Sequence, residues 1–296
     1  MMIGRRQFFS VVAVASLSGC NFYYGRKVTD TEISMAEHVG TLRHTLTDVN
    51  GLRMHSLVSI DPISADAPAV VLVHGSGLSG RYMIPTAREL TADFRVYVPD
   101  LPGFGDSGKP QKVLDVPELA DWLADWMSAI GMQRGSLLGN SFGCQVIADL
   151  AARYPDRVEH AILQGPTTPP DERSWFWQFI RWRQNQRYNP SSLGDVTNDD
   201  YKKCGFRRMY WSFQQQLTDR IEDKAPTIQA PTLVVRGEHD PISNQQWCED
   251  IARRCGRLVI IPEVAHTLCY TAPVQLADVT RLFVNESRQN VASQKE

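Results

Sequence analysis

The sequence lacks a strong charge of either sign. Its 296 residues include 31 Lys and Arg against 33 Asp and Glu, which gives a formal net charge of −2. Proteins that bind nucleic acids normally present a strongly basic domain or stripe, so no nucleic-acid partner is expected. The chain also has no internal repeat and no low-complexity tract, which argues against repeat and fibrous architectures.

Metal-ligand spacing is lacking as well. The seven histidines form no ligand-spaced cluster, so no metal site is predicted. One stretch, Gly103–Gly108, fits the G-x-G-x-x-G pattern of dinucleotide enzymes. Lys109-Pro110 follows at once, however, and no helix is expected to begin there and hold a pyrophosphate at its N-terminus. We interpret the stretch as a glycine-rich turn and expect no cofactor.

The N-terminal apolar run is too short to span a bilayer. Arg5-Arg6 precede about ten apolar residues, where a spanning helix needs about 20. The arginine pair resembles a twin-arginine export signal, and Leu17-Ser-Gly-Cys20 resembles a bacterial lipobox, whose cysteine is lipidated. We predict an export signal over residues 1–19 and a tether over residues 20–40. The protein would then be a lipoprotein that faces the periplasm from the inner or outer membrane. The other interpretation is a cytoplasmic protein with an apolar N-terminal tail.

Cysteine is scarce, with six residues in the chain. If Cys20 carries lipid, five remain, and the odd number means that at least one lies outside any intramolecular disulfide. An exported protein meets an oxidising compartment, where disulfides form. The sequence alone predicts no pairing.

Short apolar segments alternate with helical ones from about residue 41 onward. Residues 41–48 and 52–60 are predicted to form a hairpin across Asn50-Gly51, a strong turn signal. Residues 117–130 carry apolar side chains three and four positions apart, which is the helix period. Further strands are predicted at 69–73, 95–98, 136–138, 158–163, 232–235 and 258–261, and further helices at 81–92, 142–154, 244–254 and 273–284. This order predicts an α/β fold with a mainly parallel eight-stranded sheet and helices on both faces.

Residues 168–226 break this alternation. They contain no convincing buried strand and hold many aromatic residues among polar ones, between Pro169-Pro170 and Pro231. We predict a mostly helical cap, inserted between a first core part, residues 41–167, and a second, residues 227–296. The aromatic content favours an apolar acyl or alkyl group in the substrate. The candidate pocket residues are Trp175, Trp177, Phe179 and Trp211.

A candidate nucleophile lies at the turn between a predicted strand and a predicted helix. Gly139-Asn-Ser141-Phe-Gly143 fits G-x-S-x-G in the strand–turn–helix context that gives the pattern meaning. A sharp turn projects the serine hydroxyl above the sheet, and flanking glycines let the backbone pass without a Cβ clash. The same pattern also occurs as a tight turn with an idle serine, so a base must be found.

The base and the acid follow in the C-terminal third. His266 comes after the last predicted strand and is the candidate general base, since a serine hydroxyl needs a group that takes its proton. Asp240 follows the strand at 232–235 and is the candidate orienting acid, with Glu238 as the alternative. The backbone N–H groups of Phe142 and Ser76 are the predicted oxyanion donors. We interpret His74 as structural.

Together these motifs resemble the series found in the α/β-hydrolase superfamily. The resemblance rests on the segments at 74–77, 100–108, 139–143, 237–241 and 265–266, and it covers about residues 41–286 outside the cap. It implies that fold and a Ser141, Asp240, His266 triad in the family's chain order. It leaves the substrate open, because one scaffold hosts many reactions. Serine at position 141 implies ester, thioester, amide or carbon–carbon bond hydrolysis, where aspartate would have implied a dehalogenase or an epoxide hydrolase.

The predicted function is hydrolysis of an ester or related acyl bond in a small apolar or amphiphilic substrate. The alternatives are a carbon–carbon hydrolase of the meta-cleavage type and a non-catalytic ligand-binding protein on the same scaffold. Between residues 175 and 211 there are seven Lys or Arg against three Asp, beside several tryptophans. Because tryptophan and arginine favour membrane interfaces, we expect the cap to lie against the bilayer to which Cys20 attaches the protein.

Overall fold

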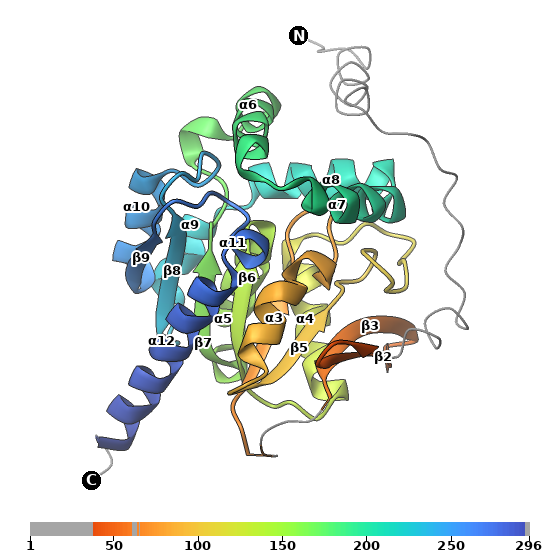
Figure 1. The fold of residues 1–296 in the computed structure, drawn as a ribbon. Coiled ribbons are helices and arrows are strands. Elements are labelled where there is room, and N and C mark those ends of the chain that lie inside the picture. The colour runs from red at the N-terminus through yellow and green to blue at the C-terminus, as the bar shows by residue number, and fades with distance from the viewer. Residues whose placement is uncertain (1–37, 61–63, 65, 294–296) are drawn as a thin grey trace. The chain divides into compact units, whose positions relative to one another are not determined.

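The computed structural model describes residues 38–60, 64 and 66–293 (Figure 1). The predicted export signal, the predicted lipidation site Cys20 and nearly all of the predicted tether lie outside these residues. Within the described part, no helix is long and apolar enough to cross a membrane.

One nine-stranded sheet forms the centre of the described fold. Its strand order is β1-β2-β3-β5-β4-β6-β7-β8-β9. Eight strands were expected, and the ninth is the two-residue β1 (His38–Val39). β2 (Leu42–Val49) and β3 (Leu52–Ser59) form the predicted hairpin, and Asn50 and Gly51 both have positive φ, as a tight hairpin turn requires. β1, β2 and β3 pair antiparallel.

The remaining six strands run parallel, which confirms the mainly parallel sheet. They are β4 (Ala69–Val73), β5 (Arg95–Pro99), β6 (Gly135–Asn140), β7 (Val158–Gln164), β8 (Thr232–Gly237) and β9 (Arg257–Ile261). β4 is buried along its whole length because helices cover both faces. Its side chains alternate between two apolar clusters, with Val71 in one and Leu72 in the other. Burying one such side chain contributes about 1.5–3 kcal/mol to stability.

Two groups of helices supply these clusters. One face packs against α4 (Val116–Ala129), α5 (Phe142–Arg153) and α10 (Gln245–Cys255). The other packs against α3 (Ile84–Leu90), α11 (Leu268–Thr271) and α12 (Pro273–Ser293). Two short 3-10 helices, η1 (Gly80–Met83) and η2 (Pro155–Arg157), precede α3 and β7. Asp115 and Glu118 form a capping box that fixes the start of α4.

The segment between β7 and β8 is helical, and the described structure places no strand in it. Figure 1 shows α6, α7 and α8 at one end of the sheet, with α6 projecting beyond the other two. The elements of this cap are η3 (Pro170–Glu172), α6 (Trp175–Asn185), η4 (Gln186–Tyr188), α7 (Ser191–Cys204), α8 (Phe206–Thr218), α9 (Ile221–Lys224) and η5 (Ala225–Thr227).

Candidate active site

Ser141 occupies the turn between β6 and α5 in a strained conformation. Its φ of 56° and ψ of −119° are rare for a residue with a side chain, and such backbones cost about 1–3 kcal/mol. The flanking glycines are required by close packing. A Cβ at Gly139 would lie 2.7 Å from the carbonyl carbon of Gly143, and one at Gly143 would lie 2.3 Å from the Val73 oxygen. The turn therefore projects the serine from the carboxyl end of the sheet.

His266 and Asp240 form a buried pair at the same end of the sheet. Nδ1 of His266 lies 2.8 Å from Oδ2 of Asp240. The other carboxylate oxygen accepts hydrogen bonds from the backbone N–H groups of Ile242 at 2.8 Å and Ser243 at 2.9 Å. With the proton held on Nδ1 by the carboxylate, Nε2 is the free basic nitrogen. It is buried and has no hydrogen-bond partner within the described protein.

Gln164 joins the serine turn to the histidine loop. Its backbone oxygen accepts a hydrogen bond from the N–H of Ser141 at 3.0 Å. Its side-chain Nε2 donates to the backbone oxygen of His266 at 2.8 Å, and Nδ2 of Asn140 donates to the side-chain oxygen of Gln164 at 2.6 Å. These buried bonds hold the candidate nucleophile and the candidate base on one framework. The catalytic roles of Ser141, Asp240 and His266 stay a prediction.

Gly165 is a site residue that the sequence analysis missed. It follows β7 with a φ of +59°, and a Cβ there would lie 2.9 Å from both Cε1 and Nδ1 of His266 and 3.2 Å from Oδ2 of Asp240. The histidine–aspartate pair passes directly over this position. Only a residue without a side chain leaves room for it. A glycine at the end of a strand reads as an ordinary turn residue, so no local pattern marked it.

The loop after β4 lies against the serine turn. A Cβ at Gly75 would be 3.4 Å from the Ser141 Cβ. The N–H of Gly75 donates to the hydroxyl of Tyr82 at 2.8 Å, and that hydroxyl donates to Oδ1 of Asn140 at 2.7 Å. Ser76 follows Gly75, and Phe142 is the first residue of α5. Phe142 thus directly follows the serine and Ser76 follows the glycine that packs against it, and the role of both as oxyanion donors stays a prediction.

His74 links this loop to the loop after β5. Its Nδ1 donates to the Gly75 oxygen at 2.9 Å, and its Nε2 accepts from the N–H of Leu101 at 3.0 Å. Burial lowers the pKa of His74, which keeps the ring neutral. Both ring nitrogens are occupied, so the geometry supports the structural role. Glu238, the alternative acid, is exposed and accepts a hydrogen bond from the N–H of Glu263.

The cap contacts the catalytic loops at three polar points. Oδ1 of Asn185 on α6 accepts a hydrogen bond from the N–H of His266 at 3.0 Å. Oδ2 of Asp200 on α7 accepts from the N–H and the hydroxyl of Ser79, at 2.9 and 2.8 Å. The hydroxyl groups of Ser212 on α8 and Ser76 lie 2.9 Å apart. Helices α6, α7 and α8 therefore each contact a loop that carries a candidate catalytic group.

The four candidate pocket aromatics lie in different surroundings. Trp175 is half-buried, stacks on Tyr210 and packs against Phe213. Phe179 is half-buried beside Trp182. Trp177 is 42% exposed and Trp211 is 47% exposed, so both side chains are accessible to solvent. Substrate contact by any of the four stays a prediction.

A second buried histidine–aspartate pair lies away from Ser141. Nδ1 of His55 is 2.8 Å from Oδ2 of Asp100, and its Nε2 is 2.7 Å from Nδ1 of His44. Burial lowers the pKa of His55, but the Asp100 carboxylate outweighs it and the net pKa is raised. Burial raises the pKa of Asp100, yet His55 brings it down to about 2. Asp100 also accepts from the N–H groups of Gly80 and Asp106, so the pair holds the glycine-rich turn. No helix begins in that turn, since α4 starts at Val116.

The cysteines of the described chain are free thiols. They are Cys144, Cys204, Cys248, Cys255 and Cys269. Burial raises the pKa of each, so none is a reactive thiolate at neutral pH. The candidate chemistry of this site therefore rests on the serine.

Comparison with known proteins agrees with the fold. The model of the alpha/beta hydrolase family matches residues 70–279. The chain belongs to this family. It is 25% identical to carboxylesterase YbfK of Bacillus subtilis (strain 168), over 75% of this chain and 79% of that protein. It is 32% identical to a haloalkane dehalogenase of Mycolicibacterium paratuberculosis, over 49% of this chain and 48% of that protein.

Solved structures extend the likeness to nearly the whole chain. The crystal structure of a membrane phospholipase A, described as a bacterial virulence factor, has a TM-score of 0.72 and 25% identity. The match covers 95% of this chain and 94% of that one. The protein is thus an alpha/beta hydrolase enzyme with esterase-like relatives.

Proposed function

We propose that this hydrolase cleaves an ester or related acyl bond through an acyl-enzyme on Ser141. The observation that carries the proposal is the buried His266–Asp240 pair, whose unpartnered Nε2 lies at the same sheet end as the strained serine. The similarity to a carboxylesterase supports ester hydrolysis. Serine rather than aspartate at the turn favours acyl transfer over dehalogenation.

The proposed reaction has two halves. The Ser141 hydroxyl attacks the acyl carbon while Nε2 of His266 takes the proton, and the backbone N–H groups of Phe142 and Ser76 stabilise the oxyanion. Asp240 stabilises the imidazolium that forms. The leaving alcohol receives that proton as its bond to the acyl carbon breaks. Water then attacks the acyl-enzyme and gives a proton to His266. His266 returns that proton to the Ser141 oxygen as the acyl–oxygen bond breaks, which releases the acid and restores the serine hydroxyl.

The proposed substrate is small and apolar or amphiphilic. Aromatic side chains make up much of the cap, and Trp175 with Phe213 presents half-buried apolar surface there. The likeness to a membrane phospholipase A supports an amphiphilic ester. We further propose that the protein is a periplasm-facing lipoprotein held through Cys20, which would place such an ester close to the enzyme.

An ester series tests this function. Purified protein and the Ser141→Ala variant are assayed on esters of one alcohol with acyl chains of increasing length, and on the matching thioester and amide. The proposal expects ester hydrolysis that rises with apolar chain length and falls by about 10⁴-fold or more in the variant. Equal rates in both proteins, or turnover of none of the esters, would refute it.

A further inference from the structure

Helix α6 buries a polar face. Of its residues, Gln178 and Asn185 are buried, and Arg181 lies on the same side, since the three are three and four positions apart. Nε2 of Gln178 donates to the backbone oxygen of Glu172, and Arg181 forms a salt bridge with the Glu172 carboxylate. Asn185 binds the backbone of His266. The helix thus docks onto the protein through hydrogen bonds and an ion pair.

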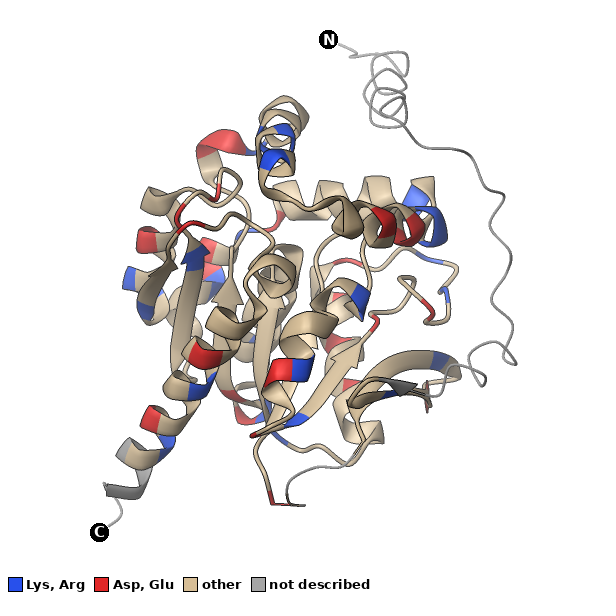
Figure 2. Cartoon of the chain, viewed as in Figure 1, with Lys and Arg blue, Asp and Glu red and all other residues tan. Residues whose placement is uncertain are grey.

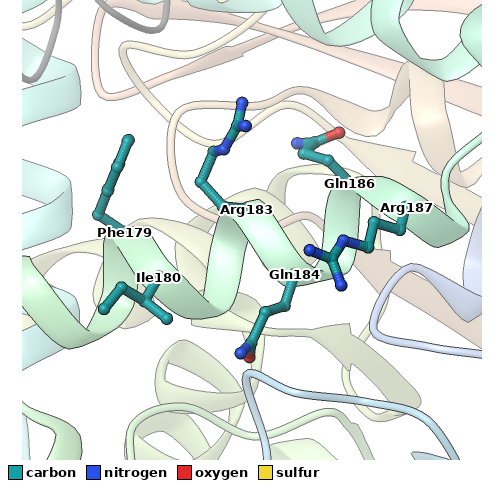
Figure 3. Close-up of a pocket in the computed structure, with 6 residues that line it drawn as sticks. All are labelled: Phe179, Ile180, Arg183, Gln184, Gln186 and Arg187. Atoms are coloured by element: carbon teal, nitrogen blue, oxygen red, sulfur yellow. The ribbon is translucent and has the colours of Figure 1, made fainter.

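The opposite face of α6, continued through η4, begins apolar and ends basic. Phe176 is 66% exposed, Ile180 is half-buried, and Arg183 and Arg187 are exposed. These residues follow one another at spacings of four, three and four, so they form one stripe. Figure 3 shows three of these residues, Ile180, Arg183 and Arg187, in this order along the helix. A cavity of about 410 Å³ lies along it, lined by Phe179, Ile180, Arg183, Gln184, Gln186 and Arg187.

This arrangement reverses the usual orientation of a surface helix. In a globular protein the apolar stripe faces the core and the polar stripe faces water. Exposed aromatic side chains recur in the cap, with Trp177 at 42%, Phe206 at 50% and Trp211 at 47% exposure. Figure 2 shows basic residues on α6 and where α7 meets α8. Aromatic side chains beside arginines suit the headgroup region of an anionic bilayer.

We propose that the outward stripe of α6, with Trp177 beside it, docks on the anionic surface of a lipid bilayer. The proposal rests on the proposed function and location. From Cys20 to His38 is 18 residues, which span at most about 60 Å, so a lipid on Cys20 keeps α6 within reach of its own membrane. A second copy is a poorer occupant, because the stripe carries no acidic residue, so an interface between two copies would bury the arginines of both without a paired carboxylate.

Docking would act on the catalytic site through the same helix. α6 ends at Asn185, and the buried bond from Asn185 to His266 ties the docked helix to the candidate base. A lipid surface that fixes α6 would therefore fix the His266 loop and present the cap to an ester in the bilayer. The expected consequence is preference for esters in anionic membranes over the same esters in water.

The test uses the full-length protein reconstituted in vesicles that contain brominated lipids, which quench tryptophan on contact. The proposal expects quenching in anionic vesicles, weaker quenching in zwitterionic vesicles or high salt, and loss of much of the quenched signal in Trp177→Phe. Phe176→Gln and Arg183→Gln should each reduce quenching and lower hydrolysis of a vesicle-embedded ester. In the Arg183→Gln variant, the rate of hydrolysis of the vesicle-embedded ester should fall about five-fold. Both should leave hydrolysis of a water-soluble short ester unchanged.

The matched control variants change residues of similar solvent exposure on other elements of the fold. Leu282→Gln on α12, at 61% exposure, and Arg43→Gln on β2 should change neither quenching nor vesicle hydrolysis. Unquenched wild-type protein, or equal effects of the control and α6 variants, would overturn the proposal. So would an α6 variant that alters self-association instead of quenching, because the stripe would then be an interface between copies. Quenching without hydrolysis of the soluble ester would refute the proposed function and leave the docking intact.

Discussion

Asn185 and His266 are joined by a buried hydrogen bond, 3.0 Å long, from the backbone N–H of the histidine to the side-chain oxygen of the asparagine. The asparagine closes the cap helix α6, and the histidine is the candidate base of the core. Nδ2 of Asn185 also lies 3.5 Å from the hydroxyl of Thr267. The cap therefore helps to position the loop that carries the imidazole.

The first prediction concerns this positioning contact. Asn185→Leu keeps the volume but leaves the His266 N–H buried without an acceptor, so we expect kcat/KM to fall by roughly 10- to 100-fold. Asn185→Asp keeps an acceptor and adds a negative charge near the ring. A negative charge beside the ring favours the imidazolium over the neutral base, so the acid limb of the kcat/KM profile should move to higher pH.

A nearby asparagine is the control for this pair. Asn189 donates to the side-chain oxygen of Gln186 within the cap, so Asn189→Leu should leave the pH profile in place. If Asn185→Asp kept the wild-type acid limb while Asn185→Leu lost activity, the contact would be structural only. Steady-state kinetics from pH 5 to pH 9 separates the two results.

The second prediction concerns Gly165. In Gly165→Ala the new Cβ would meet the His266 ring at 2.9 Å, so the imidazole must shift and kcat should fall by about 10²-fold. The positive φ adds about 1–2 kcal/mol of strain. Gly131→Ala is the matched control, because Gly131 has a φ of +77° with nothing within 4 Å of its Cβ position. Both variants should lose similar thermal stability, and only the first should lose activity.

The third prediction concerns the stability of the cap contact at Asp200. Burial raises the pKa of this carboxyl from 3.8 to about 6, against the hydrogen bonds from Ser79 and the charge of Arg81. Between about pH 4 and pH 6 the folded protein holds a proton that the unfolded chain has released. Stability contributed by Asp200 is therefore complete below pH 4 and is lost as pH rises to 6.

Asp200→Asn removes the pH-dependent loss of stability, and it keeps a side-chain oxygen that accepts hydrogen bonds from Ser79. The free energy of unfolding of the variant, relative to wild type, should rise between pH 4 and pH 6 by at most about 3 kcal/mol and then stay level. Chemical denaturation at pH 4, 5, 6 and 7.5 measures it. A difference that is constant over this range would mean that the carboxyl has an ordinary pKa.

The fourth prediction concerns location. If Leu17-Ser-Gly-Cys20 is a lipobox, Cys20→Ala blocks lipidation, and the protein should leave the detergent-soluble membrane fraction or remain uncleaved with its signal. Fractionation of cells with mass measurement of the mature N-terminus distinguishes these outcomes. Unchanged partitioning with an unchanged mass would contradict lipid attachment.

Local patterns in the sequence were sufficient for much of the fold. The apolar run at Ala69–Val73 and the Asn50-Gly51 turn depend on near neighbours in the chain, and both elements are present as predicted. The serine turn was recognisable for the same reason, because its glycines lie two residues to either side of Ser141. The two-residue β1 carries no period and could not be predicted.

The site residues that could not be predicted from the sequence act through contacts between segments that lie far apart in the chain. Gly165 matters because His266 lies above it, about a hundred positions later, and Asn185 matters because α6 ends at that same loop. Asp200 binds Ser79 from 121 residues away. None of these residues differs in its local sequence from an ordinary turn, helix end or surface carboxylate. The sequence also could not show that α6 buries its polar face. Helical periodicity reveals that a helix has two different faces, but it does not tell which of them points inward.

The most direct measurement is labelling by a fluorophosphonate, which forms a covalent bond with an activated serine. The account predicts one adduct, located on Ser141 by peptide mass spectrometry, with none in Ser141→Ala. Labelling should be slowed by orders of magnitude in His266→Ala, and severely but less completely in Asp240→Asn, because the base remains. Full labelling of the Ser141→Ala protein, or no labelling of the wild type at neutral pH, would contradict the assignment of Ser141 as the nucleophile.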